Sequence, residues 1–172
     1  AWWQQALSGE TFRIYTSADL PGVELGGALK NVIAIAGGMC DGLRLGDNAK
    51  SALLTRGIVE MARLGAAMGA RKETFFGLSG IGDLITTCYS PHGRNLRVGR
   101  EIGAGKTLPQ VLDGMVMVAE GVATCRAARD LGRQHKVPMP ITEEVFRVLY
   151  EDLAPKVGVR NLMTRPAKSE QE

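Results

Sequence analysis

The sequence predicts an all-α fold, a compact multi-helix domain preceded by one short strand. Apolar residues recur at helical spacing along most of the chain from residue 23 onward. Only one segment, near residues 12–15, alternates in the manner of a strand. The chain has 172 residues and is 45% hydrophobic, which is enough for one domain with a substantial core.

The strand pattern lies in residues 11–22, TFRIYTSADLPG, where Phe12 and Ile14 alternate before Pro21 and Gly22 break the run. No second strand pattern of similar quality follows. Because a lone strand has no partner for its backbone groups, it is either exposed to solvent or paired with sequence outside this chain.

The first predicted helix begins near Val23 and places Leu25, Leu29 and Val32 on one face. A second begins near Asp47 or Asn48, both good N-cap residues, and ends at Gly69. A glycine-rich loop is expected over residues 77–83. Thr142 is the predicted N-cap of a later helix. The remaining predicted helices span residues 94–102, 119–134, 142–153 and 156–164.

Lys30 is the first candidate for chemistry, because it lies within the otherwise small and aliphatic stretch GGALKNVIAIAGG. Residues one or two helical turns away from it, such as Gly26 and Ala34, are small and predict a groove beside the amine. One interpretation is a lysine that extends to solvent at the edge of a packed helix. The other is a partly desolvated amine that exchanges a proton or binds an oxyanion.

Asp83 ends the glycine-rich loop LSGIGD, where the chain must turn sharply or approach another group closely. Two roles are open for its carboxylate. It either caps a following helix, or it accepts hydrogen bonds from a hydroxylated ligand or orients a catalytic lysine.

A turn between Pro91 and Gly93 precedes Arg94 and Asn95, which open a predicted helix. A helix N-terminus carries free N–H groups and the positive end of the dipole, so an arginine and an asparagine there indicate a phosphate or carboxylate site. A solvated basic face is the alternative.

Several other classes of site are not favoured. The net charge of +3 is too small to indicate nucleic-acid binding. GAGKT at residues 103–107 lacks the first glycine and the preceding strand of a phosphate loop, and is interpreted as a helix end with a flexible turn. His92 and His135 have no ligands at metal-binding spacing. No Ser-His-Asp or Cys-His arrangement is evident.

The sequence also bears on location. No run of about 18 apolar residues indicates a membrane span, and the first residues do not follow the plan of a signal peptide. The three cysteines, without any C-x-x-C motif, favour a reduced, cytoplasmic setting.

Six segments, taken in order, resemble the C-terminal half of the bacterial NAD(P)-dependent glycerol-3-phosphate dehydrogenases. The resemblance extends from about Phe12 to about Arg165. The segments are GVELGGALKNVIAIAGGMCDG, SALLTRGIVEMARLGAAMGA, FFGLSGIGDLITTCYSP, GRNLRVGR, VAEGV and MPITEEVFRVLY.

The resemblance implies a helical domain like the C-terminal domain of 6-phosphogluconate-dehydrogenase-like enzymes. In that family an N-terminal domain with a G-x-G-x-x-G motif holds most of the NAD or NADP site, and this chain has no such motif after a strand. Residues 1–20 would then be the end of that domain and a linker, residues 21–166 the helical domain, and residues 167–172 a flexible tail. A homodimer is also implied.

The resemblance assigns roles by motif. Lys30 matches the general acid/base, and Asp83 a residue that contacts the substrate. Arg94 and Asn95 match residues that hold the substrate phosphate and its surroundings, and Arg94 also reaches the cofactor. Gly93 stands where the family usually has a serine, so only its backbone N–H is expected to contact the substrate. Val118 and Glu120 match cofactor contacts from this domain.

The implied reaction is the reversible reduction of dihydroxyacetone phosphate to sn-glycerol 3-phosphate, which leads into phospholipid synthesis. One alternative is a 3-hydroxyacid dehydrogenase, but those usually place an asparagine four residues after the lysine, where this chain has Ala34. The other is a non-catalytic helical module that binds a phosphorylated metabolite or forms dimers.

Overall fold

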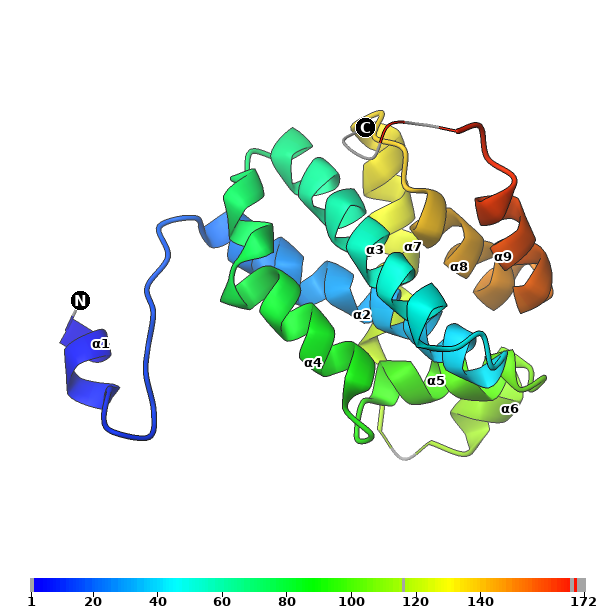
Figure 1. Ribbon diagram of the computed structural model, residues 1–172, viewed down its shortest axis with the longest axis horizontal. Coiled ribbons are helices and arrows are strands. Elements are labelled where there is room, and N and C mark those ends of the chain that lie inside the picture. The colour runs from blue at the N-terminus through cyan, green and yellow to red at the C-terminus, as the bar shows by residue number, and fades with distance from the viewer. Residues whose placement is uncertain (1, 116, 168, 170–172) are drawn as a thin grey trace.

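The computed structural model describes residues 2–115, 117–167 and 169, and within them every regular element is helical (Figure 1). This confirms the predicted all-α class. The helices are α1 (Trp2–Leu7), α2 (Leu20–Gly42), α3 (Asp47–Ala67), α4 (Asp83–Tyr89), α5 (Arg94–Gly103), α6 (Leu108–Asp113), α7 (Glu120–Gln134), α8 (Pro140–Tyr150) and α9 (Pro155–Met163). A 3₁₀ helix η1 (Lys72–Phe76) and a π-helix η2 (Leu78–Gly82) precede α4.

α2 forms the centre of the domain, and α3, α4, α5 and α7 pack around it. Its residues from 32 to 40 are buried without interruption, so the helix is apolar on nearly all sides. By length and composition α2 is the one helix among the described residues that could cross a membrane, but 61% of its apolar window is buried inside the domain. This is the pattern of a core helix in a helical bundle.

Glycines allow α5 to lie directly against α2. A Cβ added at Gly99 would lie 1.9 Å from the carbonyl oxygen of Ile35, and one at Gly38 would lie 2.1 Å from that of Leu96. Larger side chains at these positions would force the two backbones apart. The close approach fixes the N-terminus of α5, where Arg94 and Asn95 lie, beside the middle of α2.

The carboxylate of Asp19 accepts hydrogen bonds at the N-terminus of α2. It receives the N–H of Gly22 at 3.1 Å, the N–H of Arg71 at 2.9 Å and the hydroxyl of Thr74 at 2.6 Å. These hydrogen bonds, with that of Thr74 the largest contribution, lower the pKa of Asp19. The same carboxylate therefore caps α2 and ties the segment around η1 to it.

The strand predicted in residues 11–22 is wrong for the described chain. Residues 12–17 are extended but form no ladder, and α1 with this segment projects away from the helical body (Figure 1). A lone strand is unstable because its backbone groups have no partner, and no second strand is present among the residues that the structure describes.

The observed helices differ from the predicted ones in several respects. Sequence reading missed α1, α4 and α6, which are only 6, 7 and 6 residues long. Thr142 is not an N-cap but lies inside α8, whose N-cap position is Met139. The glycine-rich loop is largely the π-helix η2. The GAGKT segment follows expectation, because α5 ends at Gly103 and Gly105 adopts a φ of 105°.

Candidate functional site

Lys30 lies midway along α2, and its Nζ donates a hydrogen bond to Oδ2 of Asp83, the first residue of α4. The side chain of Lys30 is 18% exposed and that of Asp83 is 39% exposed, so the ion pair is half-buried at the surface of the domain. Two candidates that lie 53 residues apart in sequence are thereby brought together. The role of Lys30 in proton transfer stays a prediction.

The position of η2, the segment just before Asp83, depends on a glycine of α2. A Cβ at Gly26, one turn before Lys30, would lie 2.6 Å from the carbonyl oxygen of Ser79 in η2. The glycine therefore lets η2 reach the surface of α2 and delivers Asp83 to the amine. Gly27, in contrast, has no atom within 4 Å of an added Cβ, so the space there is open, and the groove beside Lys30 stays a prediction.

Asp83 does not act as a helix cap, because it lies within the first turn of α4 and makes no side-chain cap bond there. Its Oδ1 accepts a 3.4 Å hydrogen bond from the hydroxyl of Thr87, one turn later. The cap role is therefore not observed, and the other role, contact with a hydroxylated ligand or orientation of a catalytic lysine, stays a prediction.

A chain of amide hydrogen bonds connects three helices next to this pair. Nδ2 of Asn95 donates to Oδ1 of Asn31 at 2.9 Å, and Oδ1 of Asn95 accepts the N–H of Gly121 at 2.9 Å. Asn95 is only 5% exposed. Its contact with a substrate stays a prediction, while its hydrogen bonds fix α2, α5 and α7 relative to one another.

Arg94 and Glu120 are the first residues of α5 and α7, and their side chains form an ion pair with Nη2 and Oε1 2.8 Å apart. The arginine is 36% exposed and the glutamate 53%. A pair this open is held weakly and can exchange partners. Val118, in the loop before α7, is exposed as well.

Gly93 occupies the N-cap position of α5, and its N–H donates to the carbonyl oxygen of Ser90 at 3.0 Å. The backbone N–H expected to contact a substrate is therefore engaged in a turn. An added Cβ at Gly93 would lie 3.2 Å from the carbonyl oxygens of Ser90 and Thr87, so the position is tight for a larger residue. Its role in substrate binding stays a prediction.

Sequence reading missed Thr87 and Gly121. A signal for Thr87 was available, because Leu84 and Cys88 are apolar residues at four-residue spacing and indicate a short helix. In that helix Thr87 lies one turn after Asp83. Gly121 carries no local signal, because its need to be small arises from Asn31 and Asn95 on two other helices. An added Cβ there would lie 2.8 Å from Oδ1 of Asn95.

Other nucleophile and metal chemistry finds little support in the described part of the chain. Cys40, Cys88 and Cys125 are free and buried. Burial raises the pKa of Cys88 and of Cys125 to about 12, which keeps these thiols protonated. No group of three or more His, Cys, Asp or Glu side chains is placed to hold a metal ion among the described residues.

Comparison with known proteins finds a family whose match includes all of the candidate site residues described above. Residues 19–160 match the family model described as "NAD-dependent glycerol-3-phosphate dehydrogenase C-terminus". A glycerol-3-phosphate dehydrogenase [NAD(P)+] of Pelotomaculum thermopropionicum is 58% identical over 98% of this chain. One of Salinibacter ruber is 54% identical over the same share. The chain spans about half the length of these relatives, 48% and 49%.

Solved structures give the same result for the fold. The crystal structure of glycerol-3-phosphate dehydrogenase from Coxiella burnetii superposes with a TM-score of 0.89 at 41% identity, covering 94% of this chain and 50% of that one. The structure of the yeast glycerol-3-phosphate dehydrogenase superposes with a TM-score of 0.83 at 28% identity, covering 94% of this chain and 47% of that one.

Proposed function

We propose that this chain, which belongs to the NAD-dependent glycerol-3-phosphate dehydrogenase C-terminal family, forms the substrate-binding half of an oxidoreductase. The enzyme would interconvert sn-glycerol 3-phosphate and dihydroxyacetone phosphate and so supply phospholipid synthesis. The observation that supports this most directly is that the start of α5, where Arg94 lies, is tied through Asn95 to Asn31, the residue next to Lys30 of the Lys30–Asp83 pair. The names of the relatives point to the same reaction.

Lys30 would exchange the proton. In the reducing direction its ammonium group donates a hydrogen bond and then a proton to the carbonyl oxygen, where negative charge develops. In the oxidising direction the neutral amine accepts the hydroxyl proton. Asp83 would hold the amine in place through its carboxylate.

Arg94 would bind the phosphate at the N-terminus of α5. Its guanidinium is held by Glu120, and an arriving phosphate dianion competes for it with more charge and more acceptor oxygens. The helix dipole favours the anion in the same place. Asn95, anchored to Asn31 and Gly121, keeps this helix end in register with Lys30, so phosphate binding positions the carbonyl carbon for reaction.

The residues at the exposed ends of α5 and α7 suit the nicotinamide end of NAD or NADP. The carboxylate of Glu120 can accept hydrogen bonds from ribose hydroxyls, and the exposed side chain of Val118 offers apolar contact for a flat ring. When bound, the cofactor supplies or accepts the hydride at the reacting carbon. Arg94 would contact both the substrate phosphate and the cofactor.

The remaining parts of the proposal follow from the family. The rest of the cofactor site would lie in a preceding dinucleotide-binding domain, because the chain covers about half of its relatives. We propose a homodimer in the cytoplasm for the full-length protein, in keeping with three buried free cysteines.

The test is turnover of dihydroxyacetone phosphate with NADH and with NADPH, measured on the full-length protein and on this chain alone. We expect turnover by the full-length protein and little or none by this chain. Arg94→Gln in the full-length protein should raise the KM for dihydroxyacetone phosphate by about tenfold or more, since a charge-assisted contact is lost. No activity of the full-length protein toward this substrate would refute the proposal.

A further inference from the structure

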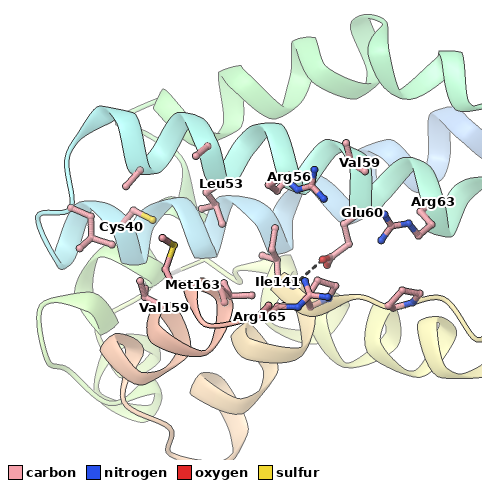
Figure 2. Close-up of a pocket in the computed structure, with 16 residues that line it drawn as sticks. Cys40, Leu53, Arg56, Val59, Glu60, Arg63, Ile141, Val159, Met163 and Arg165 are labelled. Atoms are coloured by element: carbon pink, nitrogen blue, oxygen red, sulfur yellow. Dashed lines mark hydrogen bonds between the residues drawn. The ribbon is translucent and has the colours of Figure 1, made fainter. Parts of the chain in front are cut away.

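A cavity lies apart from the Lys30 site. It has a volume of about 570 Å³ and lies between α3 and the α8–α9 pair. Figure 2 shows its lining side chains, which converge from these helices and from the segment after α9. None of the residues discussed above as the Lys30 site lines it. Cys40, its lining residue on α2, is ten residues beyond Lys30, or about 15 Å along the helix axis.

The walls of this cavity are mainly apolar. Its volume is in the range typical of small-molecule sites, which are also mostly apolar with a few polar groups. The apolar lining includes Leu53, Val59, Ile141, Val159 and Leu162. Such walls fit the hydrocarbon or ring portion of a ligand.

The polar groups of the cavity are concentrated on one part of its wall. Arg56 and Arg63 lie on α3 one turn to either side of Glu60, and Arg165 approaches from the opposite side (Figure 2). Arg56 and Arg165 are exposed, and Arg63 is partly buried. Both α3 arginines also interact elsewhere in the chain, so an incoming anion would share or exchange these contacts.

Glu60 is the one acidic residue among the described lining residues, against three arginines, and both of its oxygens accept hydrogen bonds from α8. Oε2 accepts the N–H of Ile141 at 2.8 Å, and Oε1 accepts the N–H and the hydroxyl of Thr142 at 2.9 and 2.7 Å. The carboxylate faces the first turn of α8 and is only 2% exposed as a residue. The described lining therefore carries more cationic than acidic side chains, with the single acidic one buried against α8.

We propose that this cavity binds an amphipathic anion, a molecule with one carboxylate or phosphate head and an apolar body. The head would lie among Arg56, Arg63 and Arg165, where an arginine fork matches either group. The apolar body would lie along Leu53 and Leu162. The head alone or the body alone should bind only weakly. A small anion makes no apolar contact with the walls, and a neutral hydrocarbon offers no charged group to the arginines.

The probe is octanoate, titrated into this ¹⁵N-labelled chain at constant ionic strength and followed by ¹H–¹⁵N NMR. We expect saturable shifts of amides that line the cavity, including Leu53 and Ile141, and no comparable shifts around Lys30. Acetate, which has the head alone, and 1-octanol, which has the body alone, should each bind at least about tenfold more weakly.

Two variants make the test specific to the site. Arg56→Gln combined with Arg165→Gln should weaken octanoate binding about tenfold or more, whereas Arg13→Gln, a change at an exposed arginine that does not line the cavity, should not. Ala52→Trp, at an exposed lining position on α3, should fill the cavity and abolish binding without disturbing the core. Octanoate that binds all variants equally, shifts only residues elsewhere, or does not bind would overturn the proposal.

Discussion

Lys30 and Glu60 are both charged side chains on long inner helices, and each meets the beginning of another helix, yet their surroundings differ. Lys30 pairs with one carboxylate that is 39% exposed, beside open space at Gly27. Glu60 is 2% exposed and accepts three hydrogen bonds from fixed donors of α8. The first carboxylate and amine remain open to a ligand, whereas the oxygens of Glu60 are already taken by hydrogen bonds within the fold.

The comparison indicates that different charged residues of this domain serve folding and ligand contact. A buried charge with every hydrogen bond satisfied fixes two helices and does nothing else. A half-exposed pair contributes little to folding but can transfer its proton or change partners. The two regions should therefore respond to mutation in opposite ways.

The largest effect on folding is expected for Glu60→Ala. It leaves the N–H groups of Ile141 and Thr142 buried without acceptors, so the free energy of unfolding should fall by about 3 kcal/mol or more. Urea unfolding of this chain measures it. The matched control is Glu101→Ala, which removes a surface carboxylate and should change the free energy by less than about 1 kcal/mol. Equal losses would show that burial of Glu60 is not what matters.

A smaller pair of opposite effects is expected at two adjacent glycines beside Lys30. Gly26→Ala should destabilise the domain by about 1–3 kcal/mol, because its Cβ would lie 2.6 Å from the carbonyl oxygen of Ser79. Gly27→Ala should stabilise it by about 0.5–1 kcal/mol, because the new methyl meets nothing within 4 Å. Thermal unfolding of both variants tests this. A loss at Gly27 as large as that at Gly26 would mean that the space at Gly27 is not open.

The smallest effect is a dependence on pH at Asp19, a buried carboxylate that also caps a helix. Hydrogen bonds hold its folded pKa below its ordinary value of 3.8. Its contribution is therefore present above about pH 4 and is lost as pH falls through the folded pKa, where the native carboxyl must take a proton.

This pH dependence can be isolated by substitution. Asp19→Asn should lower stability at neutral pH and flatten its decline in acid, and urea unfolding between about pH 6 and pH 3 measures both. Asp113→Asn, at an exposed carboxylate, should leave the decline unchanged. An unaltered acid limb in Asp19→Asn would contradict the assigned cause of the pKa shift.

Much of the fold could be predicted from the sequence because the long helices carry local signals. The apolar pattern of α2 and the Asp47 start of α3 are examples. α6 was missed although Thr107 and Gln110 form a capping box, since six residues show little periodicity. Thr142 was assigned wrongly because its helix is capped by Glu60, which lies 82 residues away in sequence. No local rule describes such a contact.

For the candidate site, too, local features could be predicted from the sequence and contacts between helices could not. Lys30, Asp83 and Arg94 could be singled out as charged residues in unusual local settings, and their family resemblance named them. The contact of Lys30 with Asp83 and the amide chain through Asn95 to Gly121 could not be derived, because each joins helices that only the fold brings together. The cavity beside Glu60 depends on α3, α8 and α9 at once and has no signature in any one segment.

The most direct measurement is kcat of the full-length Lys30→Ala protein with dihydroxyacetone phosphate, taken beside its thermal unfolding midpoint. We predict that kcat falls by about 10²- to 10⁴-fold, while sn-glycerol 3-phosphate binding and the unfolding midpoint stay close to those of the unmodified protein. The half-exposed position of Lys30 is the reason for expecting a small change in stability. A near-normal kcat would contradict the acid/base role of Lys30, and a large fall in the unfolding midpoint would contradict the separation of the two regions.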